Sequence, residues 1–406
     1  MITGYPDDVV RALRPGQRVY FQGGPGECAA FYNALYDNPR LSNGVELWSC
    51  LIPGINTRDY GALPGNVQLV TFMASPALEP SIASGRTTLR AMPYSEIGEL
   101  MAATEFDVAI LHVAPPDRDG RCSFGVACDM PGLVWPNAGR SVAFVNDRMP
   151  SIPGADFIPA DAISLGVPID EPLMTPVVSA RPPNAALNEI ARLSAELVPD
   201  GATIQSGIGE APGAVVAALK LHRGLRVHSG IITPDYVQLA EAGALDAGAE
   251  HLTGVAWGDA AFQAWLPQSG FAFRSALETH GHAALAAVEG FVSIGSALEV
   301  DLEGNLNLEW RAGRRISSVG GAPDYMRGAK ASGGGMSIIA LPSMASGASR
   351  IVPRLAAPSI TGDLADVVVT EHGVARLKSL SGPARAAALI AIAAPEHRGF
   401  LERSLG

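Results

Sequence analysis

The feature that most constrains the fold is a repeated pattern in which a short, uninterrupted apolar run ends at glycine or proline, and several of these runs are followed by a helix rich in alanine and leucine. Continuous apolar sequences are typical of buried strands in parallel sheets. The pattern predicts an α/β fold with open, mostly parallel sheets covered by helices. Ligands bind at the carboxyl ends of strands in such folds, so the glycine turns there are candidate site elements. The runs span residues 109–113, 141–145, 202–205, 337–341 and 366–370.

A proline-rich stretch, Ser179–Asn184, predicts a linker. An amphipathic helix is predicted directly after it, over residues 186–197. At 406 residues the chain is longer than one average domain. We therefore expect two α/β domains, residues 1–183 and residues 184–406.

Charge and hydropathy exclude several classes of protein. A formal net charge of -11 argues against nucleic-acid binding, which needs a basic surface. No uncharged apolar run reaches about 18 residues, so no transmembrane helix is predicted. The first residues lack the basic and apolar segments of a signal peptide, which predicts a cytoplasmic protein. Four cysteines fit no zinc-binding spacing, so no metal site is expected and all are predicted to be buried thiols: Cys28, Cys50, Cys122 and Cys128.

The first candidate site is the glycine turn that follows the strand predicted over residues 202–205 and opens a helix. Glycines allow a ligand to approach the backbone, and the first turn of a helix presents free N–H groups to an anion. Three interpretations stay open: a tight structural turn, a cradle for a phosphate or a pantetheine arm, and a nicotinamide dinucleotide site. Pro212 stands at the third glycine of the dinucleotide fingerprint and disfavours the last. The cradle would contain Ser206, Gly207, Ile208 and Gly209, with Glu210 beside it.

Two later segments also suggest chemistry. In His228-Ser229-Gly230, a serine beside a histidine suggests a nucleophile, but the G-x-S-x-G turn is absent and a structural turn competes with this interpretation. The pair Gly320-Gly321 exposes successive backbone N–H groups, which are suited to an oxyanion hole. A compact loop is the alternative for this pair.

Seven segments form a series in this order: Val113–Gly125, Gly207–Pro212, Ser296–Gly304, Gly320-Gly321, Ser337–Ser343, Ser349–Pro353 and Thr370–Ala375. Together they resemble the acetyl-CoA hydrolase / 4-hydroxybutyrate CoA-transferase family, a branch of the family I CoA-transferases. The resemblance covers most of the chain. It implies two similar halves with the CoA-transferase-like α/β fold, acyl-CoA between them, CoA mostly on the second half, and a homodimer or a larger homo-oligomer.

This sequence departs from the family pattern at positions that the resemblance implies for catalysis and CoA contact. The resemblance implies a glutamate that attacks the acyl-CoA and then carries CoA as a glutamyl thioester, and this glutamate aligns with Gly230. Three further polar positions are changed: a family glutamine aligns with Ala322, an asparagine with Gly295, and a lysine suited to CoA contact with Met336. Because glycine carries no nucleophile, the glutamyl-thioester route is not expected here.

Three hypotheses follow. The first is an enzyme that binds CoA or acyl-CoA as its substrate, without a covalently bound cofactor, and passes the acyl group to water or a small nucleophile in room left by the missing glutamate. The second is a catalytically inactive homologue that binds a ligand or serves as a partner subunit, and the third is a true CoA-transferase with a relocated carboxylate. Gly320 and Gly321 would stabilise the oxyanion, and Gly295 and Met336 would join the CoA site. Candidate acid–base or nucleophilic residues, each with a structural role as the alternative, are Glu210, His228, Ser229, His280 and His282.

Overall fold

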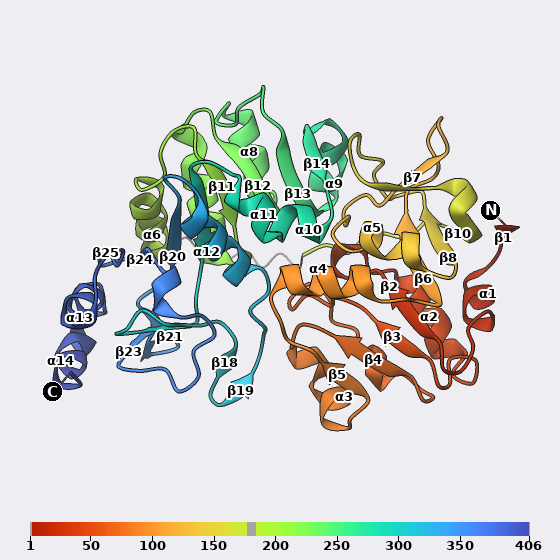
Figure 1. Cartoon of the computed structure of the whole chain (residues 1–406), viewed down its shortest axis with the longest axis horizontal. Coiled ribbons are helices and arrows are strands. Elements are labelled where there is room, and N and C mark those ends of the chain that lie inside the picture. The colour runs from red at the N-terminus through yellow and green to blue at the C-terminus, as the bar shows by residue number, and fades with distance from the viewer. Residues whose placement is uncertain (1, 177–183, 406) are drawn as a thin grey trace. The chain divides into compact units, whose positions relative to one another are not determined.

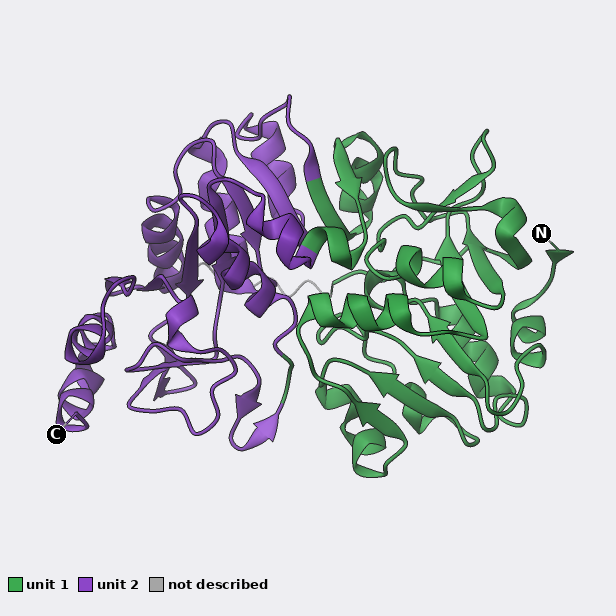
Figure 2. Ribbon diagram, in the orientation of Figure 1, with its two compact units in different colours: residues 1–177, 252–279, 316–318 green, residues 178–251, 280–315, 319–406 purple. Residues whose placement is uncertain are grey.

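Two units make up the chain in the computed structural model, which describes residues 2–176 and 184–405. Unit 1 contains residues 1–177, 252–279 and 316–318, and unit 2 contains residues 178–251, 280–315 and 319–406 (Figure 2). The units therefore interleave along the chain. Of the predicted linker only Asn184 is among the described residues, and the division into domains at residues 183 and 184 stays a prediction.

Unit 1 is built on a parallel sheet of eight strands within the described part of the chain (Figure 1). Its central strands β6 and β8 are buried along their whole length, which explains why their sequences are apolar without alternation. In spatial order the strands are β1 (Ile2–Thr3), β10 (Ile163–Ile169), β8 (Ser141–Asn146), β6 (Val108–Val113), β2 (Arg18–Phe21), β3 (Glu46–Trp48), β4 (Gln68–Thr71) and β5 (Thr87–Leu89).

Residues 252–279 join unit 1 through backbone hydrogen bonds. The Cys128 N–H donates to the Gly254 carbonyl at 2.9 Å, and the Ala276 N–H donates to the Asp129 carbonyl at 2.7 Å. A third bond, from the Asp156 N–H to the carbonyl of Phe273, measures 3.1 Å. This late segment of the sequence therefore completes the hydrogen bonding of loops that precede it by more than 100 residues.

Among the described residues of unit 2, five strands pair in parallel and a sixth pairs antiparallel at the edge. The strands of this unit run in the order β12 (Arg226–Ile232), β11 (Thr203–Ser206), β15 (Phe291–Gly295), β20 (Met336–Ala340), β24 (Val367–Thr370) and β25 (Gly373–Arg376). The carboxyl ends of the five parallel strands share one edge of the sheet, where the glycine turns lie.

Helices alternate with the strands of unit 2. The helix predicted over residues 186–197 is α6 (Ala185–Ala195), which begins where the Asn184 side chain accepts hydrogen bonds from two backbone N–H groups of the first turn. The other main helices are α7 (Glu210–Ala218), α8 (Asp235–Glu241), α12 (Ala322–Ala331), α13 (Gly382–Ala391) and α14 (Pro395–Arg403). Helices and mostly parallel sheets together confirm the predicted α/β fold.

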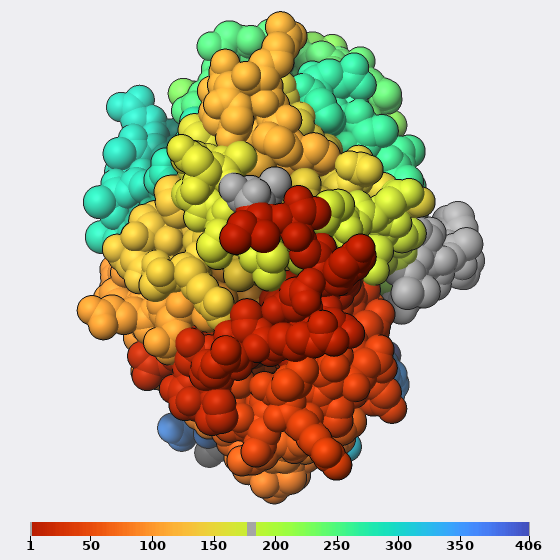
Figure 3. Space-filling model, turned by 90° about the vertical axis from the view of Figure 1, so that its right-hand side faces the viewer, coloured from red at the N-terminus to blue at the C-terminus, as the bar shows by residue number. Residues whose placement is uncertain are grey.

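The N-terminal segment lies on the surface of unit 1, in red in Figure 3. Its side chains Ile2 and Tyr5 are exposed, and β1 forms one edge of the first sheet. Among the helices of the described residues, none combines the length and the apolar character that crossing a bilayer requires.

Candidate active site

Three glycines lie level with one another at the carboxyl edge of the unit 2 sheet. Strands β11 and β15 pair with Ser206 opposite Ile294, so the next residues, Gly207 and Gly295, are level. Continued by three residues, the register of β11 with β12 brings Gly230 level with Gly207. Residues that are level in a parallel sheet face the same side. We call this strip of bare backbone, formed by Gly230, Gly207 and Gly295, the glycine row.

At two positions of the glycine row, Gly207 and Gly295, the packing of the protein does not require a glycine. A Cβ atom at Gly207 would lie 3.7 Å from the carbonyl oxygen of Ile294, and one at Gly295 would lie 3.6 Å from the Cδ1 atom of Ile339. These are ordinary van der Waals distances, and neither glycine has a left-handed φ. The missing side chains therefore leave space over the sheet edge that the protein does not fill.

The third member, Gly230, has protein side chains in front of it. A Cβ atom here would lie 2.5 Å from Cε1 and 2.6 Å from Nε2 of His280, and 2.6 Å from the hydroxyl oxygen of Tyr325. A Cβ atom at Gly321 would lie 2.6 Å from the same Nε2 atom. The buried imidazole of His280 thus sits between two glycines, and the room that the sequence led us to expect beside Gly230 is occupied.

Tyr325 comes from the first turns of α12, whose N-cap is Gly321. Its backbone N–H donates to the Gly321 carbonyl at 3.1 Å, and its ring lies 4.7 Å from the His280 ring and 6.2 Å from the Phe291 ring. Burial raises the pKa of Tyr325 well above its ordinary value, and the backbone of Gly230 lowers it to a smaller extent. No protein group in residues 2–176 and 184–405 has hydrogen-bond geometry with this buried hydroxyl. Its proton is therefore retained and has no acceptor, which suits donation to a ligand.

Strand β12 separates two of the predicted candidates. His228 shares the face of Gly230 and packs edge-on against Phe291, with ring centroids 6.1 Å apart. Ser229 points to the opposite face, where its buried hydroxyl donates to the Ile231 carbonyl at 2.8 Å. The structure therefore brings His228, but not Ser229, to the face that carries the glycine row.

The predicted cradle lies at the carboxyl end of β11. Gly209 is the N-cap of α7 and has a φ of 138°, a conformation that strongly favours glycine. Ile208 and Glu210 are exposed on either side of it. Ser206 faces away from the glycine row, because its hydroxyl is hydrogen-bonded to that of Tyr236 at 2.9 Å. Glu210 is not among the nearest neighbours of a side chain at Gly230.

Met336 does not join these residues. It is the first residue of β20 and pairs with Val292, whereas the glycine row is at the level of Ile339, three residues further along. Three residues of a strand span about 10 Å, so Met336 lies towards the amino end of the sheet. Its expected role in the CoA site is not supported by this position, because parallel strands place the glycine turns at the other edge.

Sequence reasoning missed Tyr325, although it read the double glycine as functional. One sequence signal could have indicated Tyr325. It stands four positions after Gly321, the N-cap of α12, and residues four positions apart lie on the same side of a helix. The contact with His280 had no signal in the sequence, because the two residues are 45 positions apart.

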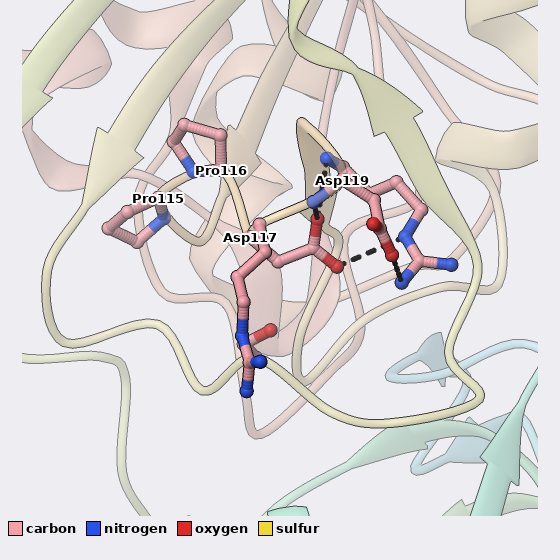
Figure 4. A pocket seen from close by; sticks show the side chains of 7 residues that line it. Pro115, Pro116, Asp117 and Asp119 are labelled. Atoms are coloured by element: carbon pink, nitrogen blue, oxygen red, sulfur yellow. Dashed lines mark hydrogen bonds and ion pairs between the residues drawn. The ribbon is translucent and has the colours of Figure 1, made fainter.

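Unit 1 has an open depression with a volume of about 740 Å³, formed by the loop after β6 (Figure 4). Arg121 pairs there with Asp117 at 3.0 Å and with Asp119 at 2.6 Å. These charges satisfy one another, so the depression has few free groups for chemistry. Among the described residues, no three histidine, cysteine or acidic side chains are grouped closely enough to hold a metal ion. The depression is lined by Pro115, Pro116, Asp117, Arg118, Asp119, Arg121 and Ser151.

Unit 1 also contains buried side chains whose pKa values are raised above their ordinary values. The Tyr94 hydroxyl donates to the carboxylate of Asp129. Burial raises the pKa of Asp129 to about 6, although the hydrogen bond from Tyr94 opposes this. Burial also raises the pKa of Cys50 to about 12, so this thiol is not a ready nucleophile. All four cysteines are buried and unpaired, as predicted.

Comparison with known proteins gives consistent matches over most of the chain. Residues 6–179 match the family model described as the acetyl-CoA hydrolase/transferase N-terminal domain, and residues 258–405 match the corresponding C-terminal domain. A 4-hydroxybutyrate coenzyme A transferase from Clostridium kluyveri is 31% identical over 97% of this chain and 95% of its own.

Solved structures agree with these matches. The 4-hydroxybutyrate CoA-transferase of Porphyromonas gingivalis superposes with a TM-score of 0.82 at 29% identity, over 100% of this chain and 97% of the other. RipA from Yersinia pestis superposes with a TM-score of 0.90 at 25% identity, over 99% of this chain and 96% of the other.

Proposed function

The chain belongs to the acetyl-CoA hydrolase/transferase family, and from this premise we propose that it is an enzyme that acts on an acyl-CoA or a related thioester. In this proposal the acyl group passes to water or a small nucleophile, with no glutamyl-CoA intermediate. His280 is the general base, and Tyr325 and the Gly320-Gly321 turn stabilise the oxyanion.

One observation carries the proposal. The resemblance aligns the family's catalytic glutamate with Gly230, and the His280 imidazole lies within 2.6 Å of the point where a Cβ atom of that residue would be. A titratable group therefore stands in front of the glycine. Histidine is the side chain that most often serves as a general acid or base in enzymes.

The chemistry follows from these positions. The imidazole of His280 accepts a proton from water while the water oxygen bonds to the thioester carbonyl carbon. Negative charge collects on the carbonyl oxygen, towards which the Tyr325 hydroxyl and the backbone N–H of Gly321 can donate. The carbon–sulfur bond then breaks, and the imidazolium returns its proton to the leaving thiolate. The products are a carboxylic acid and CoA, and the histidine is regenerated.

The structure bears differently on the two alternatives. A relocated carboxylate is disfavoured, because the three atoms nearest to a Cβ at Gly230 belong to His280 and Tyr325. An inactive homologue that binds a ligand would also use the space above Gly207 and Gly295. Turnover, rather than binding, distinguishes this alternative from the proposed enzyme.

The test is release of free thiol from a panel of acyl-CoA thioesters by the purified protein, followed with a thiol reagent. His280→Gln is expected to lower kcat by about 10²–10⁴, the usual contribution of a general base. His282→Gln is the matched control, since His282 is an exposed histidine two residues away. It is expected to leave kcat within about twofold of the parent.

Two results would overturn the proposal. Equal rates for His280→Gln and the parent protein would remove His280 from the reaction. Binding of acyl-CoA without thiol release from any thioester would favour the inactive homologue. Intact mass spectrometry after incubation with acyl-CoA gives a further check, because a covalent CoA adduct would indicate a relocated carboxylate.

The assembly and location are also proposals. The family resemblance supports a homodimer in the cytoplasm. Light scattering during gel filtration at several protein concentrations tests the dimer, and a monomer throughout would contradict it.

A further inference from the structure

The chain that leads into the Gly320-Gly321 turn belongs to unit 1. Residues 316–318 are part of that unit, and the chain returns to unit 2 at Val319 (Figure 2). Residues 316–319 lie in neither a helix nor a strand, so no sheet pairing holds them. The path of the chain into the turn therefore depends on individual contacts of this segment.

Ser318 supplies one such contact. Its hydroxyl oxygen accepts a hydrogen bond from the backbone N–H of Ala74 at 3.0 Å, in the loop that follows β4. Ser318 is 8% exposed and Ala74 is 3% exposed, so this bond is shielded from water. Because a buried N–H that loses its acceptor is costly, the bond resists movement of Ser318. The hydroxyl of the half-buried Ser317 instead donates to the Ser318 carbonyl at 3.4 Å, a contact within the same segment.

The turn itself presents two donors that the protein does not engage. Gly320 has a left-handed φ of 55°, and Gly321 is the N-cap of α12. Within residues 2–176 and 184–405, neither glycine donates its backbone N–H to a protein acceptor. The turn is fixed at its helix end, because the Tyr325 N–H donates to the Gly321 carbonyl. Its other end follows directly from the anchored Ser318, so both ends of the turn are held.

We propose that Ser318 is a positioning residue, whose hydrogen bond with Ala74 holds the Gly320-Gly321 turn where its two backbone N–H groups can donate to the carbonyl oxygen of the thioester. This inference rests on the proposed function, because negative charge develops on that oxygen only if the thioester is attacked. Ser318 itself contacts no reacting atom in this scheme. Loss of its bond should misplace donors that act in the transition state, and should therefore lower kcat rather than raise KM.

Two replacements of nearly equal shape test the role of the hydroxyl. Threonine keeps an oxygen that can accept the Ala74 N–H, whereas valine does not. Ser318→Val is expected to lower kcat for thiol release by about 10–100-fold with KM within about twofold, because small misplacements of catalytic groups have effects of this size. Ser318→Thr should retain most of the parent kcat. Ser317→Ala is the matched control and should keep both constants, since that hydroxyl contacts only its neighbour in the segment.

A second readout does not require turnover. Hydrogen–deuterium exchange, followed by mass spectrometry, reports how firmly the turn is held through a peptide that covers residues 319–325. This peptide should exchange about tenfold faster in Ser318→Val than in Ser318→Thr, whereas a peptide that covers β20 should exchange equally in both. A role of Ser318 in overall stability alone would instead speed exchange in both peptides. Ser318→Ala, which adds no methyl group, gives the same comparison against the parent if the larger side chains prevent folding.

The outcomes separate this inference from the proposed function. Faster exchange confined to the turn, with a loss of kcat that Ser318→Thr restores, would support both. The same exchange result in a protein whose parent releases no thiol would support the anchoring of the turn by Ser318 and reject the hydrolytic function. Equal exchange of the turn in Ser318→Val and Ser318→Thr would overturn the inference, whatever the thiol-release assay shows. A kcat in Ser318→Val equal to that of an active parent would overturn it as well.

Discussion

Gly230 and His280 compete for one small volume, because a Cβ atom on the glycine would lie well inside van der Waals contact with the imidazole. Gly230→Ala is therefore expected to destabilise the protein by about 1–3 kcal/mol, the usual cost of overpacking. In a His280→Ala background the same change should cost clearly less, although the nearby Tyr325 hydroxyl keeps some of the penalty. Denaturant unfolding of the four proteins of this double-mutant cycle measures the difference.

Equal costs of Gly230→Ala in the two backgrounds would contradict the contact between Gly230 and His280.

The same contact predicts the result of restoring the family glutamate at position 230. Gly230→Glu alone is not expected to create a CoA-transferase, because its side chain has no space while His280 stays in place.

The hydroxyl of Tyr325 gives a second prediction at the scale of single residues. Tyr325→Phe removes a buried group without a hydrogen-bond partner, so the free energy of unfolding should stay the same or rise by about 1 kcal/mol. If the hydroxyl stabilises the oxyanion, kcat should nevertheless fall by about 10²–10³.

Tyr20→Phe is the matched control for this change. Tyr20 also has a buried hydroxyl without a partner among the described residues, but it lies in unit 1. Its variant should gain similar stability and keep the parent kcat. A normal kcat in Tyr325→Phe would exclude that hydroxyl from the reaction.

At the ends of the strands, substitutions in the glycine row should change substrate binding without changing the stability of the protein. Gly207→Ala and Gly295→Ala add a methyl group where the protein has space, so the free energy of unfolding should change by no more than about 0.5 kcal/mol. The methyl group should obstruct a bound thioester and raise KM. Thermal melting and thiol-release kinetics on the same samples check both parts.

Gly333→Ala is the control for the glycine row, since a Cβ there would meet no atom within 4 Å and the glycine lies in an exposed loop. It should change neither property. An unchanged KM in both row variants would mean that the substrate lies elsewhere.

The buried link between Asp129 and helix α4 (Tyr94–Ala103) predicts a pH dependence of stability. The pKa of Asp129 is raised to about 6 in the folded protein, against about 3.9 in an unfolded chain. The protonated form therefore favours the folded state, and this contribution, about 3 kcal/mol at most, is present below pH 4 and lost as the pH rises through 6. Asp129→Asn, which does not titrate, should gain stability relative to the parent between pH 4 and pH 7.

Unfolding by denaturant across that pH range measures the effect. Asp161→Asn, at an exposed position of unit 1, is the control. A difference between Asp129→Asn and the parent that does not vary with pH would contradict the raised pKa.

Elements with strong local signals could be predicted from the sequence. The apolar run over 337–341 became β20 (Met336–Ala340), and the run over 366–370 became β24 (Val367–Thr370), because a strand buried on both faces needs continuous apolar residues. The end of α6 was less clear, because the apolar period continues into the turn after it.

The site could be predicted only in part. Gly207 and Gly295 carried a signal because a glycine at the carboxyl end of a buried strand lets a ligand approach the backbone, but their level positions depend on which strands are neighbours. The contact of His280 with Gly230, and the separation of Met336 from the glycine turns, depend on packing and register over long sequence distances. No local pattern encodes either.

On the scale of the whole molecule, the interleaved units predict how fragments behave. A fragment of residues 1–183 lacks residues 252–279, which supply backbone hydrogen bonds to unit 1, including those to Cys128 and Asp129. Buried N–H and carbonyl groups would lose their partners, so the fragment should not show one cooperative melting transition. Circular dichroism on heating checks this, and adding a peptide of residues 252–279 should raise the melting temperature. A fragment that melts as sharply as the whole chain would show that unit 1 is independent of the later segment.

Interleaving also sets an order of events during synthesis. The last strand of the first sheet of unit 1 ends at Ile169, and about 110 further residues are made before residue 279. At 5–20 residues per second, this is a delay of roughly 5–20 s in which the nascent sheet lacks the segment that completes it. The growing chain is then a natural client for chaperones, and slow codons in the stretch before residue 252 would lengthen its exposure.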